Sequence, residues 1–231
     1  MKPFAFKIAI FLGIVLLGLA VALLIINPKP EDNLYDGFQT PILAMEFAQR
    51  PEQIQQLFSV NNATNYEQQF LLGNWIDYGF MLSYSSFLFF ICWGIYRITR
   101  SNALLLSLIL CLVMLTGDAL ENLQIFNILL HYRSGDISAH LSWMHLFTWI
   151  KWGSIAAAFI LLSPYFFSGN LFQKTICFFQ IVCFGLAIAA FIVPGPISEM
   201  FAVTVSVNFL LLFIFAIVYK QPEDHRIQPG E

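Results

Sequence analysis

The chain has 231 residues, of which 58% are hydrophobic and 11% are charged. An average soluble domain is about 45–50% apolar and about 25% charged, so this composition excludes an ordinary soluble fold. The formal net charge of −3 and the lack of any basic run in the sequence argue against nucleic acid as a partner. Because the apolar residues come in long blocks, the sequence predicts an all-α, polytopic membrane helix bundle.

The first apolar block is Ile8–Ile26, which follows Lys2 and Lys7. At about 1.5 Å of rise per residue it is about 29 Å long, enough to cross the hydrocarbon core of a bilayer. A cleaved signal peptide is the competing interpretation, with Ala20-Val21-Ala22 as the cleavage site. The apolar residues continue beyond that site, which favours an uncleaved first transmembrane helix, and the alternative stays open.

The only long polar segment comes next, between residues 27 and 72. Pro41 and Pro51 each fit the first turn of a short amphipathic helix, since a missing N–H costs nothing there. The two expected helices cover residues 41–50 and 51–58. They would lie flat over the helix bundle as a cap, or form a connecting loop that folds on its own helices.

Five further apolar segments predict transmembrane helices, at about residues 75–96, 103–123 (with apolar residues continuing over 125–130), 143–162, 172–193 and 200–219. Pro164 is expected to end the fourth of the six spans. The expected division is therefore a first transmembrane helix (1–26), an extracytoplasmic amphipathic helical cap (27–72), a five-helix transmembrane bundle (73–219) and a cytoplasmic tail (220–231).

The basic residues predict the orientation of these spans. One side of the predicted bundle carries seven of them, namely Lys2, Lys7, Arg97, Arg100, Lys174, Lys220 and Arg226. The other side carries Lys29, Arg50 and Arg133. The positive-inside rule then places both termini in the cytoplasm and residues 27–72 outside, and we expect a bacterial inner (plasma) membrane.

The third span contains the most polar stretch of any predicted transmembrane helix. Asp118 and Glu121 are three residues apart, and Asp118 and Asn122 are four apart, so all three side chains project from one helix face. Ser107 and Cys111 continue the same face as a small and polar stripe, which is typical of a surface that faces protein rather than lipid. Ionisable residues within a span are costly, so this face is a candidate functional site.

Other spans carry polar residues at a similar depth. Asp77 and Tyr84 lie on one face of the second span, and Lys151 lies well inside the fourth. Counting about 1.5 Å per residue from the span ends places Asp77, Asp118, Glu121 and Lys151 together in the outer half of the bilayer. Lys151 is the expected partner of Asp118 or Glu121, since charges within a membrane usually pair.

Three interpretations of this polar cluster remain open: an ion-pair network that fixes helix register, a polar binding pocket, and a catalytic site with paired carboxylates. His140 and His145 could supply metal ligands beside the acids, but no metal-ligand motif is complete, and no cofactor is predicted. The four cysteines lie within spans without C-x-x-C spacing and are expected to be buried thiols.

These elements together resemble a family of uncharacterised bacterial multi-pass membrane proteins. The resemblance covers about residues 40–155. It rests on Leu43-Ala44-Met45-Glu46-Phe47-Ala48 in the cap, Asp77, Gly117-Asp118-Ala119-Leu120-Glu121-Asn122 with its D-x-x-E-N element, and Lys151-Trp152. It brings no activity with it, but it implies that Asp77, Asp118, Glu121, Asn122 and Lys151 belong together.

The leading functional hypothesis is a membrane protein that binds a lipid, a small ligand or a partner subunit through an outward-facing polar pocket. Tyr84 and the five residues of the cluster would line that pocket or hold it together. One alternative is an intramembrane, metal-dependent or metal-free, hydrolase or transferase acting on a lipid-like substrate. The other is an ion- or proton-coupled transporter, which needs polar residues that continue to the cytoplasmic face; few lie on that side of Ser107.

Overall fold

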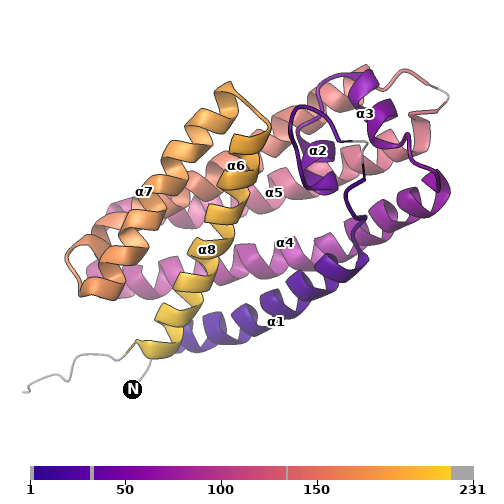
Figure 1. Ribbon diagram of the computed structural model, residues 1–231. Helices are drawn as coiled ribbons and strands as arrows, with labels where there is room; N and C mark the ends of the chain where they lie inside the picture. The colour runs from indigo at the N-terminus through magenta and orange to yellow at the C-terminus, as the bar shows by residue number, and fades with distance from the viewer. Residues whose placement is uncertain (1–2, 32–33, 134, 220–231) are drawn as a thin grey trace, which may run out of the picture.

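A computed structural model describes residues 3–31, 34–133 and 135–219. Within these ranges the chain forms eight α-helices and no strand, which confirms the all-α class (Figure 1). The helices are α1 (Phe4–Ile26), α2 (Pro41–Glu46), α3 (Pro51–Leu57), α4 (Ala63–Thr99), α5 (Asn102–His131), α6 (Ser138–Phe167), α7 (Leu171–Ile192) and α8 (Pro196–Val218). Six of them, all except α2 and α3, are long and apolar enough to cross a membrane. The expected tail, with Lys220 and Arg226, and Lys2 fall outside the described residues.

The six long helices pack as a ring in chain order. α1 lies along α4, α4 along α5, α5 along α6, α6 along α7 and α7 along α8, and α8 closes the ring against α1. The beginning of α1 and the end of α8 lie at the same end of this bundle, where the rings of Phe6 and Tyr219 are 4.7 Å apart. α2 and α3 lie at the opposite end, which we name the cap end.

Most long helices extend beyond the predicted spans. The largest difference is at α4, which begins at Ala63, whereas the apolar pattern predicts a start near Trp75. Asn62 caps its first turn by accepting a hydrogen bond from the Asn65 N–H, and Phe58, next to α3, packs against Phe70. The polar first turns of α4 are therefore held by the cap end of the protein rather than by lipid.

The predicted end of the fourth span at Pro164 is wrong, because α6 continues to Phe167. A proline within a helix leaves the carbonyl four residues earlier without its usual backbone donor. Here the Ser163 hydroxyl donates to the Ile160 carbonyl, at 2.8 Å, and satisfies that oxygen. The helix can therefore pass through the proline without leaving a bare carbonyl in an apolar setting.

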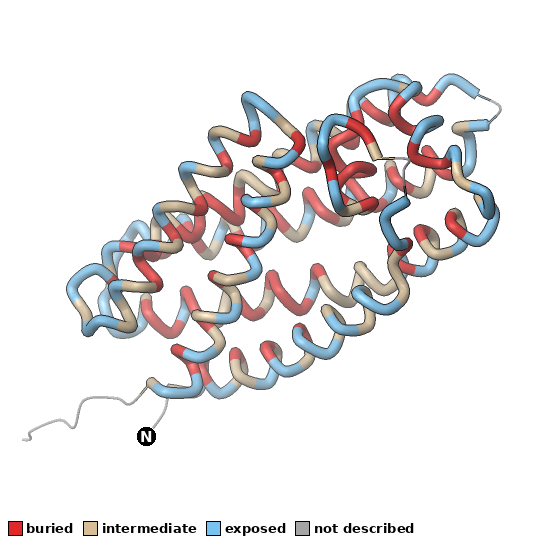
Figure 2. The backbone as a smooth tube through the Cα atoms, in the orientation of Figure 1, coloured by how far each residue is buried: buried red, intermediate tan, exposed pale blue. Residues whose placement is uncertain are grey.

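The buried apolar residues form two cores. Figure 2 shows that buried positions occur both along the long helices and at the cap end. The larger core fills the bundle between its six helices and includes Phe87, Leu88 and Phe159, all fully buried. The smaller core lies at the cap end, where α2 and α3 pack on α4, α5 and α6 through residues such as Met45 and Leu57. The polar cluster described below lies where these two cores meet.

Two sets of contacts fix the cap helices in place. Tyr35 donates its hydroxyl hydrogen to the Ala44 carbonyl, and burial raises the pKa of Tyr35, which keeps it a neutral donor. Glu199, in the first turn of α8, accepts hydrogen bonds from the Gln39 N–H at 2.9 Å and from the Thr40 N–H at 2.8 Å. The Thr40 hydroxyl donates to its second oxygen at 2.7 Å. The residues directly before α2 are thus bonded to the first turn of α8.

Candidate functional site

The Lys151 ammonium group lies at the centre of a buried polar network. It contacts Glu46 of α2 at 3.1 Å, Asp118 of α5 at 3.4 Å, and Glu121 of α5. Lys151 is only 5% exposed and Glu121 is fully buried. The ammonium group thus forms ion pairs with three carboxylates at once. The prediction that Lys151 pairs with Asp118 or Glu121 is confirmed, and it pairs with both.

Each of these three carboxylates has a second donor for its other oxygen. Tyr84 donates to Asp118 at 2.5 Å, Thr148 donates to Glu121 at 2.6 Å, and the Trp152 indole N–H donates to Glu46 at 2.9 Å. Every carboxylate oxygen in this set therefore has a partner, as a buried charged group requires. We name these seven residues the Lys151 network: Glu46, Tyr84, Asp118, Glu121, Thr148, Lys151 and Trp152.

The close packing of α5 on α6 brings the acids within reach of Lys151. Gly117 lies directly against α6: a Cβ atom at this position would come 2.8 Å from the Ile150 side chain and 3.0 Å from the Lys151 backbone nitrogen. Only a residue without a side chain lets the two backbones approach this closely. Asp118 and Glu121 follow within about one turn of Gly117, so they face Lys151 at contact distance.

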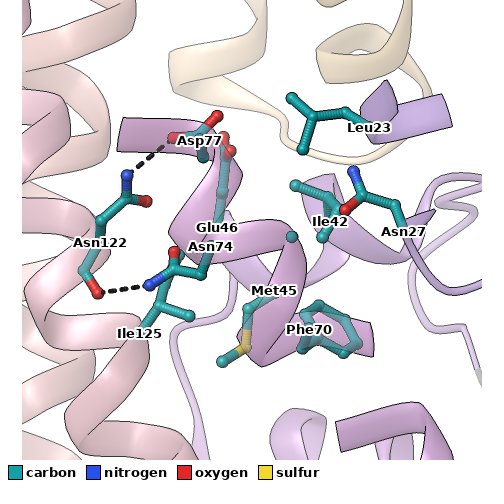
Figure 3. Close-up of a pocket in the computed structure, with 11 residues that line it drawn as sticks. Leu23, Asn27, Ile42, Met45, Glu46, Phe70, Asn74, Asp77, Asn122 and Ile125 are labelled. Atoms are coloured by element: carbon teal, nitrogen blue, oxygen red, sulfur yellow. Dashed lines mark hydrogen bonds between the residues drawn. The ribbon is translucent and has the colours of Figure 1, made fainter. Parts of the chain in front are cut away.

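A second polar group lies beside the Lys151 network and involves Asp77, Asn74 and Asn122. The Asn122 amide donates to Asp77 Oδ2 at 2.7 Å, and the Asn74 amide donates to the Asn122 backbone carbonyl at 3.0 Å (Figure 3). Both acceptors require an N–H, which fixes the orientation of the two amides. Asp77 is half-buried, while Asn74 and Asn122 are buried.

These three residues line a small cavity at the cap end, between α1, α2, α4 and α5. Its volume is about 30 Å³. A cavity needs about 10–15 Å³ to hold one water molecule, so this one has room for a small ion or about two waters. The lining residues are Leu23, Asn27, Ile42, Met45, Glu46, Phe70, Gly73, Asn74, Asp77, Asn122 and Ile125.

The two candidate metal-ligating histidines contact other side chains in the structure. His140 lies 2.8 Å from the Gln124 side-chain oxygen and its ring stacks on that of His131. The His145 ring packs edge-on against Trp149. In the described parts of the chain, no three or more His, Cys, Asp or Glu side chains are grouped so that they could hold a metal ion.

The sequence predicted the central residues of the site but missed five others. Asp118, Glu121, Lys151 and Tyr84 meet in one network, and Asp77 with Asn122 forms the neighbouring group. The residues not predicted as site residues are Glu46, Asn27, Asn74, Thr148 and Trp152. Glu46 reaches the site through the packing of the short helix α2, which no helix periodicity reveals. The only signal was the position of Glu46 in the cap that was expected to lie above the acids.

Comparison of this chain with models of known protein families, with curated proteins and with solved structures gave no match.

Proposed function

We propose that this chain is a non-catalytic integral membrane protein that binds a small ligand in the polar cavity at the cap end. The observation that carries the proposal is the unequal bonding of the Asp77 carboxylate. Oδ2 accepts a hydrogen bond from Asn122, whereas Oδ1 accepts none from any described residue, and Asp77 lines the cavity. An ionisable group at this depth is costly without a partner, so a bound ligand is the natural partner.

The Lys151 network supports this division of roles. Its carboxylates are bonded at both oxygens, so it offers no free acid or base for catalysis and serves as an ion-pair core that holds α2, α5 and α6 together. Only Glu46 belongs to both the network and the cavity lining. We therefore place the binding function at Asp77 and the structural function at Lys151.

The dimensions of the cavity favour a small ligand over the other proposed occupants. A lipid headgroup or a helix of a partner subunit is far larger than a cavity of about 30 Å³. Transport through the same acids would need a polar route to the other end of the bundle. Phe87, Leu88, Ile91 and Phe159 are fully buried in the bundle core and offer no polar group along such a route. These observations support binding over transport.

The location of the site follows from the proposed orientation. With both termini in the cytoplasm of a bacterium, as the positive-inside rule favours, the cavity lies in the outer half of the inner membrane and the cap lies outside. The ligand would then reach the cavity from the extracytoplasmic side.

Native mass spectrometry on gently solubilised protein tests this proposal. The wild-type protein should carry an additional mass that disappears in Asp77→Asn, which removes the charge and preserves the shape. Glu67→Gln is the matched control, because Glu67 bonds to Tyr132 and Arg133 outside the cavity. A bound mass that is the same in the wild type and in Asp77→Asn would contradict the assignment of the site.

A further inference from the structure

We propose that the ligand of this cavity is a small monovalent cation, held by the side-chain oxygens of Asp77, Asn74, Asn122 and Asn27. This inference rests on the proposed binding function and names the chemical class of the ligand. It is drawn from the orientation of the amides, the size of the cavity and the balance of charge around it.

The bonding of the amides leaves oxygen atoms for the cavity. The Asn74 amide nitrogen donates to the Asn122 backbone carbonyl, and the Asn122 amide nitrogen donates to Asp77 Oδ2, so the amide oxygens point away from these two acceptors. The Oδ1 atoms of both amides accept no hydrogen bond from any described residue, although Asn74 is only 6% exposed and Asn122 only 3%. Both residues line the cavity, so these oxygens can accept from a donor or coordinate a cation bound there.

Asn27 adds a further acceptor from the opposite wall. Its Oδ1 is buried and has no hydrogen-bond partner among the described residues. It lies against Gly73, where a Cβ atom would come 2.2 Å from it. Gly73 therefore leaves the space in which the Asn27 oxygen lies, and Asn27 shares the cavity lining with Asp77 (Figure 3).

The charge around the cavity favours a positive ligand. Four carboxylates, from Glu46, Asp77, Asp118 and Glu121, lie in this region with one ammonium, from Lys151. Lys151 contacts the other three carboxylates, and no ion pair joins Asp77 to a basic side chain among the described residues. A compact positive charge at the cavity would supply Asp77 with that partner.

The number of free ligands distinguishes between kinds of cation. Divalent calcium takes about 6–8 oxygen ligands, commonly with several carboxylates, whereas only Asp77 offers a free carboxylate oxygen here. One carboxylate with carbonyl-type oxygens balances a single positive charge. The shared chemistry is that of an alkali-metal ion, an ammonium ion or the ammonium group of a primary amine.

Thermal unfolding of the purified protein in detergent tests the charge of the ligand. The probes are sodium, potassium, ammonium and ethanolammonium chlorides, each compared with N-methyl-D-glucammonium chloride at equal ionic strength. At about five times the dissociation constant, a bound cation should raise the melting temperature by about 2–4 °C. An effect of the simple ions identifies a free ion as the ligand, and an effect restricted to ethanolammonium identifies an amine.

Three variants connect the effect to the cavity. Asp77→Asn should abolish the cation-dependent shift, and Glu67→Gln should retain it. Gly73→Ala should weaken it, because the new methyl group displaces the Asn27 oxygen while leaving the Asp77 charge in place. A melting temperature that does not depend on the cation would overturn the proposal.

A second measurement does not depend on affinity. In Ile42→Cys the new thiol lines the cavity, and the four native cysteines are buried. A cationic aminoethyl thiosulfonate should label this thiol faster than an anionic sulfonatoethyl thiosulfonate, by on the order of tenfold. The ratio should approach one in Ile42→Cys/Asp77→Asn, and an unchanged ratio would contradict the inference.

The two proposals fail in different ways. A neutral or anionic mass that is bound by the wild type and lost in Asp77→Asn would overturn the cation and preserve the binding function. No bound mass together with no cation-dependent shift would overturn both.

Discussion

At the scale of single residues, the position of Lys151 decides how much the polar network contributes to stability. Replacing one half of a buried ion pair is more costly than replacing both, because the remaining charge has no partner. Lys151 has three carboxylate partners rather than one. Its loss therefore leaves three acids facing one another in an apolar setting.

We predict that Lys151→Met lowers the free energy of unfolding by about 3–5 kcal/mol. The double variant Glu121→Gln/Lys151→Met should unfold at a higher temperature than Lys151→Met, since it leaves two uncompensated acids instead of three. Thermal unfolding in detergent measures both. Equal melting temperatures for the single and double variants would show that the acids do not depend on Lys151.

The sequence predicts residues of this network to the extent that helix geometry alone determines them. Depth along the helices was enough to bring Asp118, Glu121 and Lys151 together, because all three lie on long, regular helices. Glu46 could not be placed in the same way: it reaches Lys151 only through the packing of a six-residue helix, which no periodicity describes. The orientation of the two amides, with the Asn122 nitrogen donating to Asp77 and the Asn74 nitrogen donating to the Asn122 carbonyl, also depends on contacts between different helices.

At the scale of the helices, the close packing of α5 on α6 depends on Gly117. We predict that Gly117→Ala destabilises the protein by about 1–3 kcal/mol, because its methyl group meets the Lys151 backbone, which cannot move aside. Gly153→Ala in α6 is the matched control, since no atom lies within 4 Å of its added carbon. That control should be neutral or stabilising by up to about 1 kcal/mol.

Chemical or thermal unfolding of both variants in the same detergent measures the difference. The prediction fails if Gly117→Ala is as stable as Gly153→Ala.

The helices themselves were predicted better than their ends. Six spans follow from apolar length, whereas the start of α4 at Ala63 depends on the Asn62 cap and on contacts with residues near α3.

At the scale of the whole molecule, one carboxylate on α8 holds the cap across the ring. Glu199 accepts three hydrogen bonds from Gln39 and Thr40, directly before α2. α2 carries Glu46, which reaches both Lys151 and the cavity. The first turn of α8 is therefore connected, through α2, to the binding site.

We predict that Glu199→Ala loosens the cap, because hydrogen bonds to a charged group contribute about 1.5–3 kcal/mol each. Amide hydrogen exchange over α2 should become faster, while exchange in the middle of α5 should stay unchanged. Glu52→Ala on the exposed side of α3 serves as the control. Exchange in α2 that is equally slow in both variants would show that the cap does not need this contact.

The Lys151 network also has a consequence for biosynthesis. Its three acids precede Lys151 in the chain, so the ribosome completes Glu46, Asp118 and Glu121 before their only described counter-ion exists. α5 by itself would expose two acids to lipid, and we expect it to wait at the insertion machinery until α6 arrives and then to enter the bilayer with it as a hairpin. Crosslinking of arrested chains that end before and after α6 would show α5 leaving the machinery only in the longer ones.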